Sequence, residues 1–215
     1  MIQSKYLIEL LARYPQLLVC EDSICQAYQI LLDSFANQNK LLVAGNGGSC
    51  ADAEHLVGEL MKGFCLPRCL DACQKKELVN VDKEIGEALG EKLQGALPAL
   101  ALDNHNALNT AYLNDIDGLY IYAQQVYGYG QAGDVFLGIS TSGNSKNIIN
   151  AAVVAKAQKL KVIGLTGKNG GRLKGYCDVC ICVPEMQTFK VQELHLPVYH
   201  CLALMLEEKI FGMLE

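Results

Sequence analysis

Two loops in the sequence carry groups suited to binding an anion. Residues 45–49, Gly-Asn-Gly-Gly-Ser, follow an apolar run and precede a segment with helical character. Glycine permits a sharp turn and a close approach of the backbone to a ligand, and the free N–H groups of a helix N-terminus favour negative charge. Residues 140–145, Ser-Thr-Ser-Gly-Asn-Ser, follow another apolar run and supply four hydroxyls. This number of hydroxyls favours a phosphate site over ordinary helix caps.

Two pairs of side chains could act on a ligand held by these loops. His55 and Glu59 lie four residues apart just inside the first predicted helix, so they share one face. Gln192 and His200 lie in a second predicted helix and, at about 100° per residue, are separated by about 80°, so both can face one cleft. His195 falls on the other side and is expected to be a hydrogen-bonded structural histidine.

These residue types allow two kinds of chemistry. The four side chains could hold Zn²⁺, although glutamine is an uncommon ligand. Without a metal, Glu59 could move a carbon-bound proton while His200 protonates an oxygen. Spacing alone does not choose between them, and a His/Glu pair at this spacing is more often an ordinary surface pair. Nucleotide-binding loops fit poorly, because 45–50 lacks the third glycine of GxGxxG and no Gly-Lys-Ser/Thr follows either loop.

Composition narrows the classes further. The chain has 215 residues, of which 51% are hydrophobic and 19% charged, as expected for one globular domain. A net charge of −5 without a basic cluster argues against nucleic-acid binding. No apolar stretch reaches the roughly 18 residues that span a bilayer, and no leader segment is visible, so we expect a cytoplasmic protein without a membrane partner. The ten cysteines are then expected to be mostly small buried hydrophobes.

Short apolar runs alternate with helical patterns along the chain. This order predicts an α/β protein with a parallel sheet covered on both faces, in which ligands bind at the carboxyl ends of the strands. Both loops lie at such ends and could converge. Pro197 is unexpected inside a helix, and a kink there could re-aim His200. The predicted strands are 41–44, 99–102, 135–139, 162–166 and 178–183. The first predicted helices lie before Pro15, between a cap at 22–23 and residue 35, and from residue 49 onward. A weak helix is predicted over 81–94, and further helices around 119–126, over 146–159 and over 188–209. A polar loop is predicted after residue 103.

Four ordered motifs resemble those of the phosphoheptose isomerases, which are sugar isomerase (SIS) domain proteins. They are 44–49 with Asp52, His55 and Glu59, then 138–145, 165–171, and 192–195 with His200. The resemblance implies a flavodoxin-like, three-layer α/β sandwich with a five-stranded parallel sheet flanked by helices. It also implies a homotetramer with active sites at subunit interfaces. The whole of 1–215 would be a single SIS domain, with N-terminal helices in 1–38 and an insertion at about 62–97.

The resemblance also implies an activity and roles for particular residues. The family converts sedoheptulose 7-phosphate to a glycero-manno-heptose 7-phosphate through an enediol. Glu59 would be the base and His200 the acid, and His55, Glu59, Gln192 and His200 match positions that bind zinc in some members. Substrate-binding positions would be Asn46, Gly47, Gly48, Ser49, Asp115, Ser140, Thr141, Ser142, Ser145 and Gln192.

Two other functions remain open at this point. One is a non-catalytic SIS protein, either a sugar-phosphate sensor or a partner of the replication initiator. The other is an isomerase or lyase of a different phosphosugar. His55, Glu59 and His200 are all present, which favours an enzyme over a sensor.

Overall fold

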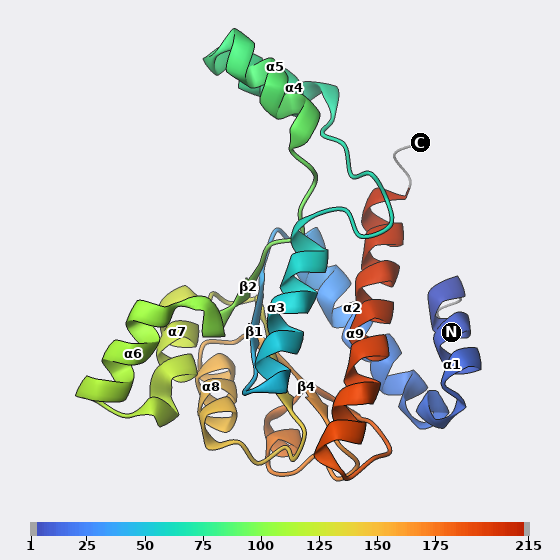
Figure 1. The fold of residues 1–215 in the computed structure, drawn as a ribbon, viewed down its shortest axis with the longest axis vertical. Helices are drawn as coiled ribbons and strands as arrows, with labels where there is room; N and C mark the ends of the chain where they lie inside the picture. The colour runs from blue at the N-terminus through green and yellow to red at the C-terminus, as the bar shows by residue number, and fades with distance from the viewer. Residues whose placement is uncertain (1–3, 213–215) are drawn as a thin grey trace.

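Five short strands form one parallel sheet in the order β2-β1-β3-β4-β5 in the computed structural model, which describes residues 4–212 (Figure 1). All four strand pairings are parallel. Every residue of β1 and β3 is buried, which requires helices on both faces of the sheet. The predicted three-layer α/β fold is therefore confirmed. The strands are β1 Leu41–Ala44, β2 Ala99–Ala101, β3 Val135–Ser140, β4 Lys161–Thr166 and β5 Val179–Cys182.

Alternation along the strands divides the core into two layers. Successive side chains of a strand point to opposite faces, so Val43 joins one apolar cluster and Leu42 the other. The first cluster packs under α1 (Lys5–Arg13), α2 (Glu21–Ala36), α3 (Gly48–Met61) and α9 (Thr188–Phe211). The second packs under α7 (Ile121–Tyr129), α8 (Lys146–Ala157) and the 3₁₀ turn η4 (Leu173–Tyr176).

Two helices stand apart from these layers. α4 (Ala72–Val81) and α5 (Lys83–Lys92) form a helical hairpin that projects from the body at the top of Figure 1. Gly86 lets the two helices approach closely, because a side chain there would collide with the Leu78 backbone. The two connecting segments pair through an antiparallel bridge between Cys69 and Gln94. We call residues 69–94 the arm.

The structure corrects several predicted elements. The weak helix predicted over 81–94 corresponds to α5, and α4 before it was missed. Asp82 separates the two, because it ends α4 and its side chain caps α5. The predicted polar loop contains α6 (Asn106–Asp115), which has no buried residue and therefore no apolar stripe to reveal it. α2 starts at Glu21, just before the predicted cap. α9 runs through Pro197 as one continuous helix.

The cysteine prediction is wrong in the main. Only Cys20 and Cys201 are buried, and Cys65, Cys69 and Cys73 are exposed because they lie on or beside the arm, outside both core clusters. Cys180 and Cys182 lie in β5, as the strand prediction for 178–183 required. Among the described helices, none is both long enough and apolar enough to cross a membrane.

Candidate active site

Two uncapped helix N-termini meet at the carboxyl edge of the sheet. α3 begins after Gly47, which has a φ of 56° and provides no side-chain cap, and α8 begins after Ser145, whose hydroxyl caps nothing. Neither helix has an acidic residue in its first turn. Ser49 and Cys50 donate their backbone N–H groups to the carbonyl oxygens of Asn46 and Gly47, and Ile148 donates to Asn147 Oδ1. Both helix dipoles still favour an anion at this edge of the sheet.

The two predicted loops lie side by side because β1 and β3 are neighbours in register. Ala44, the last residue of β1, pairs with Gly138, two residues before the end of β3, so the two strands end close to each other. Asn46 and Asn147 exchange side-chain amide hydrogen bonds of 3.0 and 2.8 Å across the gap between the loops. Ser140 is buried, and its Oγ lies 3.0 Å from Oγ of Ser145.

The remaining hydroxyls of the second loop differ in exposure. Ser142 is exposed, and its Oγ accepts a 3.1 Å hydrogen bond from the backbone N–H of Asn144. Thr141 is half-buried, while Ser49 in the first loop is buried at the start of α3. The two loops together present hydroxyls and amides around one edge of the sheet.

A His/Glu/His group lies where α3 and α9 run next to each other in Figure 1. His55 Nε2 is 3.4 Å from Glu59 Oε1 and 3.4 Å from His200 Nε2. The other oxygen of Glu59 pairs with Lys62 Nζ at 3.0 Å. The Glu59 side chain is only 14% exposed, so its carboxylate lies in a sheltered position beside both imidazoles.

Aromatic and polar neighbours surround the two histidines. The hydroxyl of Tyr199 lies 3.1 Å from His55 Nδ1 and 3.3 Å from Asp52 Oδ1. The Tyr199 ring packs edge-on against His200 with ring centroids 5.0 Å apart. The Phe64 ring also packs against His200, in a tilted arrangement with ring centroids 5.3 Å apart. Burial, reinforced by His55, lowers the pKa of His200. His200 is therefore a neutral imidazole at neutral pH.

Gln192 and Asp115 lie apart from this group. The amide of Gln192 lies over Gly48 so closely that any side chain at Gly48 would collide with it. Gln192 precedes His200 by eight residues, a rise of about 12 Å along the helix. Asp115 ends α6, on the side of α3 away from α9 in Figure 1, and accepts a 2.8 Å hydrogen bond from Asn114. Their substrate roles stay predictions.

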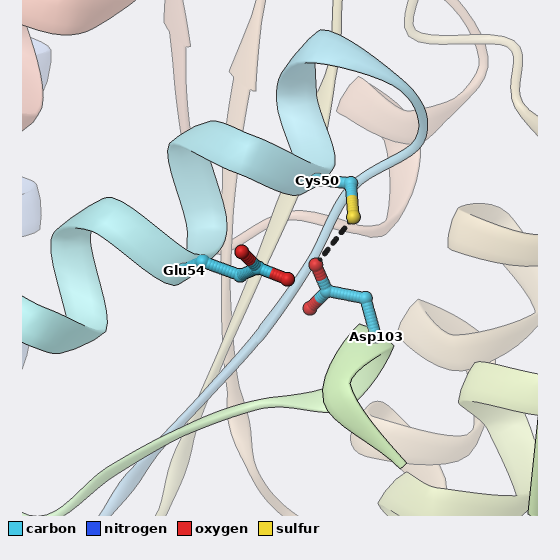
Figure 2. Close-up of side chains that lie close together, drawn as sticks. All are labelled: Cys50, Glu54 and Asp103. Carbon is cyan, nitrogen blue, oxygen red and sulfur yellow. Dashed lines mark hydrogen bonds between the residues drawn. The ribbon is translucent and has the colours of Figure 1, made fainter. Parts of the chain in front are cut away.

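A second cluster of possible metal ligands lies on another face of α3 (Figure 2). Within the described part of the chain, the ligand atoms of Cys50, Glu54 and Asp103 form one group of three that lie within 4.8 Å of one another. Cys50 Sγ donates a 2.6 Å hydrogen bond to Asp103 Oδ2. Burial, together with this bond, raises the pKa of Cys50 to about 12, so the thiol keeps its proton.

Sequence reasoning missed parts of both groups. Tyr199 stands directly before His200, but a tyrosine in an apolar helix is usually a core residue and carries no signal by itself. Lys62 follows Glu59 at helical spacing, and that i,i+3 relation could have identified it. Asp103 approaches Cys50 only through the packing of β2 beside β1, which one sequence does not reveal.

Comparisons with known proteins agree on one family. A family model described as "SIS domain" matches residues 86–167. A phosphoheptose isomerase from a Nitratiruptor species is 39% identical over 179 residues, which cover 83% of this chain and 82% of the relative. A phosphoheptose isomerase structure from Neisseria gonorrhoeae has a TM-score of 0.72 at 30% identity, covering 94% of this chain and 93% of that one.

A second solved structure extends the match. The phosphoheptose isomerase from Francisella tularensis superposes with a TM-score of 0.75 at 30% identity, covering 92% of this chain and 91% of that one. Relatives matched over most of both chains, together with two hydroxyl- and glycine-bearing loops at helix N-termini and a sheltered carboxylate beside His55, leave one assignment. The chain belongs to the phosphoheptose isomerase family of SIS-domain proteins.

Proposed function

We propose that this protein is an aldose–ketose isomerase that converts sedoheptulose 7-phosphate to D-glycero-D-manno-heptose 7-phosphate. One observation carries the proposal: Glu59 lies beside His55, which in turn contacts His200, on the helix whose uncapped N-terminus adjoins the hydroxyl loop. The names of the relatives support the same substrate.

The distance between the two ends of the site suits a long substrate. Ser49 and Glu59 are ten residues apart on α3, a rise of about 15 Å. The phosphate and the carbonyl of a seven-carbon sugar phosphate lie at opposite ends of its carbon chain. The phosphate could therefore bind near Ser49 while the carbonyl end lies near Glu59. Asn46, Gly47, Gly48, Ser49 and the hydroxyls of Ser140, Thr141, Ser142 and Ser145 would bind the phosphate, with Gln192 beside them. Asp115 would complete the site.

The reaction needs one base at carbon and one proton carrier at oxygen. Glu59 would remove a proton from C1 of the ketose and return it to C2, through a cis-enediol. His200, as a neutral imidazole, would donate its N–H to the C2 oxygen and take the proton from the C1 hydroxyl. The phosphate loops would hold C1 and C2 near these groups, which lowers the entropic cost of the step.

Some of the same residues are spaced for a zinc ion. Tetrahedral Zn²⁺ with bonds of 2.0–2.1 Å places its ligands about 3.3 Å apart, and the two 3.4 Å separations at His55 Nε2 are close to this spacing. Glu59 and His200 would have to approach each other to bind one ion, because the three side chains do not form a group whose ligand atoms all lie within 4.8 Å of one another. His55, Glu59 and His200 would hold the ion, and a bound ion would polarise the substrate carbonyl. Gln192, one of the four positions matched by the family, lies about 12 Å along α9 from His200, which favours its substrate-binding role.

The test is a product assay with a matched pair of variants. Purified protein incubated with sedoheptulose 7-phosphate should give the aldose in NMR spectra. Glu59→Gln should lower turnover by roughly 10²–10⁴-fold, because the base is removed, while the sugar phosphate still binds. Glu84→Gln, at an exposed glutamate on α5 outside both groups of side chains, should retain turnover.

Two other outcomes would overturn parts of this proposal. Binding of the sugar phosphate without turnover in the wild type would indicate a regulator, and turnover of a different phosphosugar alone would indicate another isomerase or lyase. Unchanged turnover in Glu59→Gln would remove Glu59 from its role. The homotetramer and the cytoplasmic location stay predictions, and sedimentation velocity tests the former.

A further inference from the structure

A chain of polar contacts leads from the interior of the protein to the two histidines. Asp52 and His55 both lie on α3, and the Tyr199 hydroxyl from α9 lies between them, 3.3 Å from Asp52 Oδ1 and 3.1 Å from His55 Nδ1. Tyr199 is 1% exposed, so water cannot replace either contact. His55 then contacts His200 through the two Nε2 atoms, 3.4 Å apart.

The direction of the hydrogen bonds in this chain follows from the available protons. Burial raises the pKa of Asp52, while the Tyr199 hydrogen bond and His55 act against this shift. Where Asp52 is ionised it can only accept, so the single hydroxyl hydrogen of Tyr199 goes to Asp52. The Tyr199 oxygen is then left as an acceptor towards His55 Nδ1, which must carry a hydrogen. A neutral imidazole with its hydrogen on Nδ1 has a free lone pair on Nε2.

The free lone pair points into the proposed site. His55 Nε2 is the atom that lies 3.4 Å from both Glu59 Oε1 and His200 Nε2. In the metal-free protein, His200 can therefore donate its Nε2 hydrogen to His55. The opposite arrangement would place the Tyr199 oxygen against the ionised Asp52 with no proton between them, which is unfavourable in a buried position.

We propose that Tyr199 is a positioning residue, which, held by Asp52, keeps the hydrogen of His55 on Nδ1 and leaves Nε2 as the acceptor that faces Glu59 and His200. The tautomer assignment depends only on these contacts. Its catalytic consequence rests on the proposed function, because the acceptor Nε2 is useful only where Glu59 and His200 act. Partners that fix a ligand histidine in this way typically contribute 10–100-fold in metal affinity or activity.

The test is nitrogen NMR of the full-length, metal-free protein labelled with ¹⁵N-histidine. The chain has only four histidines, so each imidazole can be assigned. The wild type at a pH where His55 is neutral should show a protonated Nδ1 and an unprotonated Nε2. Tyr199→Phe should give a mixture of both tautomers, and kcat should fall by about 10–100-fold with little change in KM.

Asp52→Ala provides a second test, because alanine has no acceptor for the Tyr199 hydroxyl. The hydroxyl is then free to donate to His55 Nδ1, so the proposal expects the His55 hydrogen to move to Nε2. Tyr112→Phe is the matched control, because it removes a hydroxyl that bonds Gln124 at 2.8 Å on another part of the molecule. That variant should leave both the tautomer and kcat unchanged.

The outcomes separate this inference from the isomerase assignment. An unchanged His55 tautomer in folded Tyr199→Phe refutes the positioning role. If that variant does not fold, an unchanged tautomer in Asp52→Ala refutes it equally. A wild type with the expected tautomer but without isomerase activity would support the positioning role and overturn the proposed function instead.

Discussion

At the scale of single residues, His195 combines deep burial with missing partners. It is 0% exposed, and among the described residues neither ring nitrogen makes a hydrogen bond of standard geometry, although the Thr166 backbone lies close enough to act against the lowering of its pKa. The expected structural histidine is buried, but without a well-formed hydrogen bond. Burial lowers its pKa to about 4, against about 6.5 in an unfolded chain. Between these values the unfolded chain binds more protons than the folded one. The free energy of unfolding therefore rises with pH through this window and falls as the pH drops.

This linkage predicts the acid response of a variant. Between pH 7 and pH 4 the wild type should lose about 3 kcal/mol more stability than His195→Leu, because leucine has no proton to gain. Urea unfolding at pH 7, 5.5 and 4 measures the difference. Parallel stability curves for the two proteins would show that His195 does not titrate as its burial requires.

At the scale of elements, one carboxylate of α9 organises the segment that leaves α3. Glu207 accepts hydrogen bonds from the backbone N–H groups of Phe64, Cys65 and Leu66, and pairs with Arg68 at 2.8 Å. Arg68 also donates to the carbonyl oxygens of Leu60 and Glu59. This buried network ends α3 and holds Phe64 against His200, so packing at one end of α9 supports the candidate site.

Removing the charge of Glu207 should be strongly destabilising. Both partners are buried, with side chains 0% and 1% exposed, and an uncompensated buried charge costs about 3–5 kcal/mol. We expect Glu207→Gln to lower the free energy of unfolding by about this amount in urea titrations. The neighbouring Glu208, whose partner Lys5 is 68% exposed, provides the control, and Glu208→Gln should have a far smaller effect. Similar losses in both variants would contradict the role of burial.

At the scale of the whole molecule, the arm extends beyond the two core clusters. No residue of α4 is buried, and only Gly86 and Gly90 of α5 are. Four large apolar side chains on the arm face solvent, with Val81 at 89% exposure: Val81, Ile85, Leu89 and Leu93. An antiparallel pair of ten-residue helices is marginal by itself, so the arm depends on the contacts that its two helices make with each other.

Exposed positions on the arm should tolerate charge. The double variant Ile85→Lys with Leu89→Lys should change the free energy of unfolding by no more than about 0.5 kcal/mol per site. Leu60→Ala, at a fully buried position of α3, should cost about 2–5 kcal/mol in the same experiment. A loss of several kcal/mol in the lysine variant would instead indicate that the apolar face of the arm is covered in solution.

Secondary structure was predicted correctly where the local pattern of apolar residues reflects burial in the folded protein. Each predicted strand was found within one or two residues, because a strand buried on both faces is a continuous apolar run between turns. α4 and α6 were missed because neither buries a residue, and of the arm only α5 was predicted, as a weak helix. The burial of the cysteines was predicted wrongly because burial depends on where a segment packs in the fold, and residues 65–73 lead away from the core.

The sequence by itself determined the order of strands and helices, the two glycine- and hydroxyl-rich loops and the candidate histidines, since each depends on neighbours within a few residues. Only the tertiary structure decided which strands are adjacent, and hence that the loops meet. It also decided that α9 lies along α3, so that residues about 145 positions apart come within 3.4 Å. Such contacts depend on how whole elements pack, and no local pattern in the chain records that packing.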